Sequence, residues 1–250
     1  MNKLIVVGEK FKTFSDKNEN VMTVHEFERF VWSGEIANVK KIILGQGVQF
    51  DDIERTIHII HRNYPDKIKK IINLSDLYYQ NSKDLKKLVH KRRKANILIT
   101  SPVKQENGNY DSKLILQDSS ELLCDHQTGQ HIQGMILIEA ARQAMIATTE
   151  KYFLNNSGIS MTEKYFTLTS LNVSFLSFVF PLPVIVSLNV LSHKITKYGK
   201  FTGEYNIAFY QDEIKSAEIG FIFSVYDLIY ITQKEGEQAS ICHHHYLENI

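Results

Sequence analysis

The spacing of apolar residues along the chain changes near residue 96. Before that point, short β-branched runs alternate with segments of helical spacing, which predicts strands at 3–8, 40–45 and 67–75 and helices at 23–32, 50–64 and 82–94. Thr23 and Glu26 have the spacing of a capping box, and Gly34 follows the expected helix end. Strands that alternate with helices pair in parallel through right-handed crossovers. We therefore predict a small three-stranded α/β domain, Rossmann-like and about half of a doubly wound fold, over residues 1–95.

Beyond residue 96, the pattern predicts one long apolar helix and several long strands. We expect the helix at 133–153 and the strands at 96–103, 113–123, 165–180, 184–196, 201–211 and 215–229. One buried helix followed by a meander of antiparallel strands is typical of a sheet wrapped around a helix, the hotdog architecture. The predicted fold class is therefore α+β, with the α/β domain at 1–95, a hotdog domain at 96–231 and a C-terminal tail at 232–250.

The long helix carries three polar residues in an otherwise apolar stretch. Residues 134–148 are apolar or small nearly all round, yet they include Glu139, Arg142 and Gln143. Their i, i+3 and i+4 spacing places all three on one helical face. A buried carboxylate and guanidinium are costly unless they are paired and hydrogen-bonded. Either this is a structural ion pair, or the helix delivers these groups to a site.

Composition sets the class of protein but does not indicate a ligand. The chain has 250 residues and a formal net charge of +1, so no overall field points to nucleic acid or to a membrane. Its two cysteines, Cys124 and Cys242, do not suggest a disulfide framework, and no apolar run approaches the roughly eighteen residues of a membrane span. We expect a soluble, cytoplasmic protein.

Three further motifs are weaker. Gly45 and Gly47 lie between a strand and a helix, but Phe50 replaces the third glycine of a dinucleotide fingerprint, so a plain turn is favoured. The basic run 90–94 is expected to be a solvated helix end. The alternative is a docking patch for an acidic acyl carrier protein. The histidines at 243–245 are expected in a mobile tail. We expect no metal and no cofactor.

One segment resembles a known family signature. It contains two histidines, two glycines, a glutamate and an arginine at fixed spacing, in the order Asp125-His126-x-x-Gly129-x-His131-x-x-Gly134-Met135-x-x-x-Glu139-Ala140-x-Arg142-Gln143. This pattern resembles the A-factor biosynthesis (AfsA-type) hotdog family and, more loosely, the β-hydroxyacyl-carrier-protein dehydratases. Thr128 and Gln133 stand where dehydratases usually carry prolines. In architecture, the resemblance extends over residues 96–230.

The resemblance implies a substrate class and an assembly. Hotdog proteins resemble one another in binding acyl-pantetheine thioesters along a tunnel between paired subunits. The expected partners are therefore an acyl carrier protein or a coenzyme A thioester, together with a small hydroxylated acceptor. Lactone-forming members commonly carry two hotdog repeats, whereas this chain shows one copy of the motif. A homodimer is therefore expected to complete the double hotdog.

The same resemblance suggests the catalytic residues. Glu139 is expected to act as a general base or to orient a nucleophilic hydroxyl or water. Arg142 would hold Glu139 as a carboxylate or grip a phosphate on the acceptor. The dehydratase resemblance assigns a catalytic histidine to His126, and His131 is the second candidate. For each histidine, a structural role in the loop is the alternative.

Four more positions are expected to bind substrate. Gly134 begins the helix, where backbone N–H groups can polarise a thioester carbonyl and a missing side chain allows close approach. Gln143 shares the face of Glu139. Asp125 and Gly129 belong to the loop before the helix, and Asp125 suits a loop or N-cap anchor.

The predicted reaction is acyl transfer from a carrier protein or coenzyme A to a hydroxylated acceptor, in γ-butyrolactone-type signal or secondary-metabolite biosynthesis. Dehydration of a β-hydroxyacyl thioester and thioester hydrolysis are alternatives on the same fold. A non-catalytic acyl-binding module is the alternative of a different class, because a fold does not establish a function.

Overall fold

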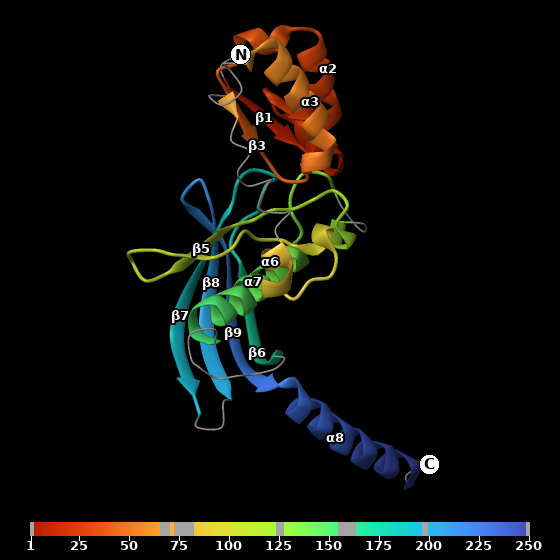
Figure 1. The fold of residues 1–250 in the computed structure, drawn as a ribbon, viewed down its shortest axis with the longest axis vertical. Coiled ribbons are helices and arrows are strands. Elements are labelled where there is room, and N and C mark those ends of the chain that lie inside the picture. Colours follow the sequence, from red (N-terminus) through yellow and green to blue (C-terminus); the bar gives the residue numbers. More distant parts are fainter. Residues whose placement is uncertain are drawn as a thin grey trace.

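The computed structural model describes residues 3–65, 71–72, 83–123, 128–154, 164–196 and 200–248. Figure 1 shows two parts stacked along the long axis, with the N-terminal α/β part at one end and a larger sheet with its helix below it. A C-terminal helix projects from the far end of the larger sheet (Figure 1). The sequence predicted these two parts from the change in the spacing of apolar residues near residue 96, and the structure contains both.

The N-terminal sheet is parallel and has the strand order β2-β1-β3. Its members are β1 (Lys3–Val7), β2 (Val21–Thr23) and β3 (Lys41–Leu44). β1 and β3 were predicted, but β2 was not, because three residues are too few to show a period. Ile72 forms a parallel bridge with Ile42, as a strand at 67–75 would require; apart from residues 71 and 72, that stretch lies outside the described residues.

Helices cover this sheet and supply much of its core. They are η1 (Glu9–Phe11), α1 (Lys12–Lys17), α2 (Val24–Trp32), η2 (Glu35–Asn38) and α3 (Phe50–Asn63), whereas α6 (Lys83–Leu88) lies in the larger part of the molecule, where Leu85 joins the core (Figure 1). The predicted capping box at Thr23 and Glu26 is present, and Gly34 adopts φ +83° just past α2. Leu4, Phe27 and Ile53 are fully buried between the sheet and the helices. The apolar faces of α2 and α3 therefore pack as their spacing predicted.

The last predicted helix of this part, 82–94, is too long. α6 ends at Leu88, and the chain turns through His90, which has a left-handed φ of 54°. The Lys91 N–H donates to the Lys86 carbonyl and the His90 N–H to the Lys87 carbonyl, at 3.0 and 3.2 Å. These two bonds make a Schellman motif, which usually has glycine at its left-handed position. The absence of a glycine explains why the sequence pattern did not reveal the turn.

The larger sheet is antiparallel, with six strands in the order β4-β5-β7-β8-β9-β6. Its strands are β4 (Val103–Lys104), β5 (Tyr110–Lys113), β6 (Lys164–Phe175), β7 (Ile185–Ile195), β8 (Phe201–Gln211) and β9 (Ile214–Asp227). The helix α7 (Gly134–Thr148) continues as a π-helical segment, η5 (Thr149–Leu154), and lies against β6 to β9 (Figure 1). Buried alanines, at 140, 141, 144 and 147, let the helix approach the sheet closely. This is the predicted hotdog fold.

The strands predicted at the edges of this domain are shorter than expected. In place of 96–103 and 113–123, the regular strands are β4 and β5, flanked by η3 (Lys94–Asn96), η4 (Glu121–Leu123) and an isolated bridge between Ile99 and Leu114. β6 ends at Phe175 rather than at residue 180. The apolar runs at 97–99 and 114–116 are buried at the junction of the two domains, and burial produced the pattern that was interpreted as extended strands.

The two domains share backbone hydrogen bonds. The Gly47 N–H donates to the Leu116 carbonyl at 2.8 Å, and Gly47 forms a parallel bridge with Gln117. The side chain of Gln46, 4 % exposed, donates to the Leu114 carbonyl and accepts from the Leu116 N–H, at 3.1 and 2.9 Å. The loop containing Gly45 and Gly47 is therefore the junction between the domains.

Over the described residues, the C-terminal tail expected at 232–250 is helical and belongs to α8 (Leu228–Glu248). No residue of α8 is buried. His243, His244 and His245 are exposed along this helix. Within the described part of the chain, no group of three or more His, Cys, Asp or Glu residues is arranged to hold a metal ion.

Candidate functional site

The polar residues of α7 form one connected cluster. The Arg142 Nε donates to Glu139 Oε2 at 2.7 Å, and an Arg142 Nη donates to Oε1 at 3.0 Å. The Gln143 amide also donates to Oε1, at 3.0 Å. The side chains of Glu139 and Arg142 are 18 % and 30 % exposed. The structure therefore brings together the three residues predicted to share a face, at the edge of the solvent.

A fourth residue, Lys91, joins this cluster from the segment that follows α6. Its Nζ lies 2.7 Å from Glu139 Oε1, and the Lys91 side chain is 23 % exposed. The sequence pattern had placed residues 90–94 at a solvated helix end, and for Lys91 that is wrong. The only signal in the sequence was a cation-rich run that precedes a helix with a buried glutamate, and it does not identify the partner.

The cluster keeps Glu139 ionised. Burial raises the pKa of Glu139, but the hydrogen bonds and charges of Arg142, with those of Lys91 and Gln143, outweigh it and hold the pKa below its usual value. Oε1 accepts three hydrogen bonds and Oε2 accepts one. One carboxylate beside two cations leaves a net charge of +1. These contacts favour an orienting role for Glu139 over proton abstraction.

Gln143 anchors the cluster to the start of the hotdog domain. It is fully buried, donates to the Asn96 carbonyl at 2.8 Å and accepts from the Leu98 N–H at 2.9 Å. Because these two backbone groups flank a buried segment, Gln143 satisfies polar groups that would otherwise be unpaired. The role of Gln143 in this structure is to fix α7 against residues 96–98.

The loop before α7 contacts the α/β domain. Gly129 has φ +70°, and its carbonyl accepts from the Phe14 N–H at 2.9 Å. The His131 ring packs on the Phe178 ring, with centroids 4.8 Å apart, and its Nδ1 lies 3.3 Å from the Thr128 hydroxyl. In the described contacts, His131 does not touch the Glu139 cluster. Asp125 and His126 lie outside the described residues.

The beginning of α7 is more crowded than expected. A Cβ atom at Gly134 would meet the Phe175 ring. Apolar side chains surround this helix end and are largely exposed: Met135 66 %, Phe175 55 %, Leu176 58 % and Phe178 67 %. We call these four residues the apolar patch. Exposed apolar surface of this kind marks contact with a partner or a ligand.

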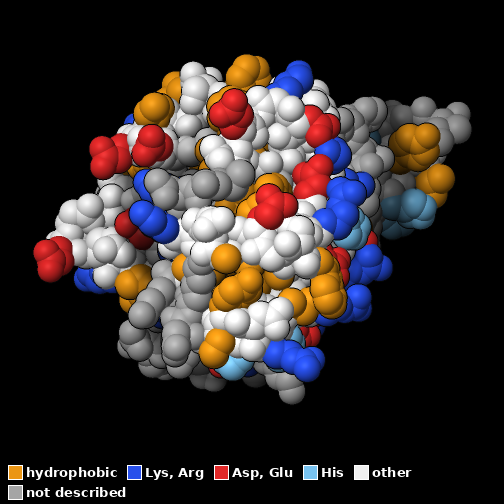
Figure 2. Space-filling model, turned by 90° about the horizontal axis from the view of Figure 1, so that it is seen from above, with side chains coloured by type: hydrophobic (Ala, Val, Ile, Leu, Met, Phe, Trp, Pro, Cys, Tyr) orange, Lys and Arg blue, Asp and Glu red, His pale blue; other side chains and the backbone are white. Residues whose placement is uncertain are grey.

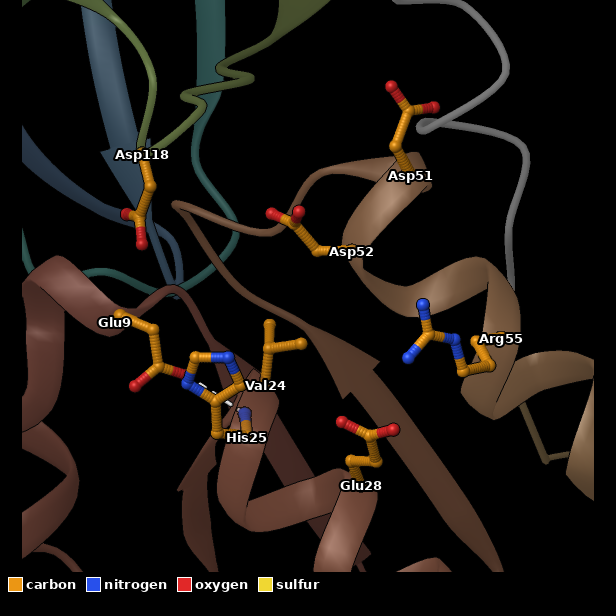
Figure 3. Close-up of a pocket in the computed structure, with 8 residues that line it drawn as sticks. All are labelled: Glu9, Val24, His25, Glu28, Asp51, Asp52, Arg55 and Asp118. Atoms are coloured by element: carbon orange, nitrogen blue, oxygen red, sulfur yellow. Dashed lines mark hydrogen bonds and ion pairs between the residues drawn. The ribbon is translucent and has the colours of Figure 1, made fainter.

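A cavity of about 300 Å³ lies at the carboxyl ends of the parallel strands (Figure 3). Because β2 and β3 lie on opposite sides of β1, this crevice is the topological switch point, where α/β folds commonly bind ligands. It is lined by charged residues of η1, α2 and α3 and by one residue of the hotdog domain, namely Glu9, His25, Glu28, Asp51, Asp52, Arg55 and Asp118, together with Val24. Figure 2, which views the molecule from above the α/β domain of Figure 1, shows most of the visible Lys and Arg side chains along one side of that outer face.

Asp118 enters this cavity from the hotdog domain. Its Oδ2 accepts from the Lys10 N–H at 3.1 Å, while Oδ1 is buried and has no hydrogen-bond partner among the described residues. A Cβ atom at Gly8 or Gly47 would collide with this carboxylate. Burial raises the pKa of Asp118 to about 6, against the opposing hydrogen bonds of Lys10 and Glu9. The Asp118 carboxylate therefore lies directly against the backbone turns that contain Gly8 and Gly47.

A comparison with known protein families gives a match that covers most of the larger domain. The family model of the A-factor biosynthesis hotdog domain matches residues 85–225. No curated protein matches the chain. Within the described part of the chain, no helix is long and apolar enough to cross a membrane.

Several solved structures are similar to part of the chain. A mutant thioesterase from Pseudomonas aeruginosa is 14 % identical, with a TM-score of 0.40, over 60 % of this chain and 99 % of that one. A mutant thioesterase from Staphylococcus aureus is 13 % identical, with a TM-score of 0.36, over 50 % and 91 %. A conserved protein from Pseudomonas aeruginosa is 13 % identical, with a TM-score of 0.37, over 59 % and 97 %.

Proposed function

We propose, because this chain belongs to the A-factor biosynthesis hotdog domain family, that it transfers an acyl group from a carrier-protein or coenzyme A thioester to a small hydroxylated acceptor. The observation that carries the proposal is the cluster of Lys91, Glu139 and Arg142 on the central helix, with its surplus positive charge at the edge of the solvent. Such a charge suits the stabilisation of an anion that forms during the reaction.

The transfer exchanges one acyl bond for another. The acceptor hydroxyl oxygen attacks the thioester carbonyl, the C–S bond breaks, and the hydroxyl proton passes to the departing thiolate. Negative charge develops on the carbonyl oxygen during attack, and the Arg142 guanidinium can stabilise it while Glu139 holds the guanidinium in place. Because no electrons are exchanged with an outside carrier, the proposed reaction needs no cofactor beyond the thioester.

The acceptor could also meet this cluster through an anionic group. Arg142 directs two of its donor nitrogens to Glu139 and has further N–H groups for another partner. A phosphate on the acceptor would suit a planar guanidinium backed by a lysine. Secondary-metabolite or γ-butyrolactone-type signal biosynthesis in the cytoplasm is the setting that we propose for such a transfer.

We further propose that the working form is a homodimer. β6 is an edge strand of twelve residues, and its exposed side chains include Leu168 and Leu171, 46 % and 42 % exposed. A long apolar edge strand is an aggregation hazard unless it is covered. A second copy on β6 would also cover the apolar patch beside the start of α7 and enclose space for an acyl chain.

A panel of acyl thioesters tests the reaction. Carrier-protein and coenzyme A thioesters are each incubated with and without dihydroxyacetone phosphate, and the product masses are read. An ester of the acceptor supports transfer, whereas the free acid indicates hydrolysis and a loss of water indicates dehydration. Bound acyl chains in the purified protein without turnover of any thioester would instead support the non-catalytic acyl-binding alternative.

Variants of the cluster test the roles. Glu139→Gln and Arg142→Ala should each abolish turnover while circular dichroism and the oligomeric state stay as in wild type. The matched control is Arg92→Ala, because Arg92 is exposed and has no ion pair with any described residue. Full activity of both cluster variants would overturn the assignment of these roles.

A further inference from the structure

The segment that joins the two domains contacts α7 and η5 at three levels. Lys91 meets Glu139 near the beginning of α7, Asn96 and Leu98 meet Gln143 in its middle, and His90 lies 2.7 Å from Glu150 in η5. We call residues 90–98 the strap. Each contact involves a polar group of the helix that is mostly or fully buried, so the strap is part of the surroundings of the cluster rather than a loose linker.

The strap begins in a backbone conformation that is costly for its residue. His90 occupies the left-handed position of the Schellman turn, where the Cβ atom of a non-glycine residue comes too close to the following carbonyl oxygen. Glycine would adopt this turn more easily, but it would lose the contact with Glu150 and the edge contact with the Phe166 ring, whose centroid is 5.5 Å away. The side chain of His90 therefore offsets the strain and fixes the direction in which Lys91 leaves the turn.

Lys91 differs from the cations beside it. Lys86, Lys87, Arg92 and Lys94 form no ion pair with any described residue, and Arg93 pairs with Glu121 at the exposed surface. Lys91, in contrast, is 23 % exposed and is directed at Glu139 Oε1. Pairs between fully exposed charges contribute little to stability, but a partly buried pair with several donors fixes geometry. Without Lys91, the Glu139 carboxylate would be held by α7 alone, through Arg142 and Gln143.

From these contacts we propose that Lys91 is a positioning residue of the Glu139–Arg142 site: its ammonium group holds the Glu139 carboxylate in the orientation that aims Arg142 at the substrate. The inference rests on the proposed thioester function for the part that concerns turnover. It makes Lys91 a component of the site and leaves the exposed Arg92 beside it outside the site.

Three variants test the proposal. Lys91→Met removes the charge and keeps much of the side-chain length, Lys91→Arg keeps the charge, and Arg92→Met is the matched control on the neighbouring exposed residue. The ionisation of Glu139 is followed by ¹³C NMR of its side-chain carboxyl, which is identified by its absence in Glu139→Gln. Initial rates with an acyl thioester are measured over the same pH range.

In Lys91→Met, the Glu139 titration should move upward toward the ordinary value for a glutamate, because one of its donors is lost. The acidic limb of the pH–rate profile should move the same way, and kcat should fall about tenfold to a hundredfold with KM little changed. Lys91→Arg should restore most of the rate, and Arg92→Met should resemble wild type.

The outcomes that overturn the proposal are distinct from failure of the proposed function. An unchanged Glu139 titration in Lys91→Met refutes the contact between Lys91 and Glu139. An equal shift of the Glu139 titration in Arg92→Met would show that any nearby positive charge has the same effect, and it would also refute the specific role of Lys91. A shifted titration with an unchanged rate refutes the positioning role. If wild-type protein turns over no thioester, the proposed function fails, and the titration still decides whether Lys91 holds Glu139.

Discussion

Replacing Asp118 by asparagine should stabilise the protein at neutral pH but not in acid. Asp118 carries a carboxylate from the hotdog domain into the crevice of the α/β domain, where Oδ1 is buried without a partner. Asparagine is neutral at every pH and can still accept the Lys10 N–H through its side-chain oxygen. The variant therefore removes the buried charge while keeping the hydrogen bond that the carboxylate makes.

The magnitude follows from the pKa of Asp118, which rises from 3.8 to about 6 in the folded chain. At about 1.36 kcal/mol per pKa unit, a shift of about two units corresponds to about 3 kcal/mol. Solvent screening over the exposed part of the side chain reduces the expected gain to about 1–2 kcal/mol. Because the folded pKa lies above the unfolded one, the folded chain binds the extra proton between about pH 4 and 6. Wild-type stability from this group falls as the pH rises through that window.

Urea unfolding of both proteins at about pH 4 and about pH 8 measures the difference. Asp118→Asn should be more stable at the higher pH, and the gap should close at the lower one. Asp51→Asn is the matched control, because Asp51 lines the same cavity but is exposed in the first turn of α3. It should show no gain. Equal stability of Asp118→Asn and wild type at both pH values, or an equal gain at both, would refute the reasoning.

Three further predictions concern the fold. Gln143→Leu should lower the free energy of unfolding by about 2–4 kcal/mol in urea titrations, because it leaves the Leu98 N–H and the Asn96 carbonyl unpaired; no loss would mean that water replaces the amide. Gly45→Ala should cost about 1–3 kcal/mol in the same assay, because a Cβ atom there collides with the Pro181 backbone. A chain ending at Asp227 should keep the unfolding free energy within about 0.5 kcal/mol, because α8 buries no residue, and a larger loss would show that α8 packs on something in solution.

The periodic elements could be predicted because their patterns are local. The β-branched runs of β1 and β3, the capping box of α2 and the long strands β7 to β9 each show a period within one segment. The short strand β2 and the Schellman turn at His90 were missed for the opposite reason. Three residues have no measurable period, and a left-handed turn without glycine has no signature in composition.

The candidate site likewise contains some residues that the sequence could predict and others that it could not. The common face of Glu139, Arg142 and Gln143 follows from helical spacing, and the sequence motif resembled the family that the comparison then matched. Lys91 lies 48 positions before Glu139 in the chain, and the contact between them depends on how the strap crosses α7. The meeting of Asp118 with Gly8 and Gly47 depends likewise on how the two domains dock.

Spacing along this chain was therefore enough to establish two domains, a buried central helix and the residues that share its polar face, since each depends on neighbours a few positions away. Which cation meets Glu139, which carboxylate fills the crevice of the α/β domain and where the edge strands end depend on contacts between segments far apart in sequence. Such contacts form only when burial brings the segments together, and no local pattern records them.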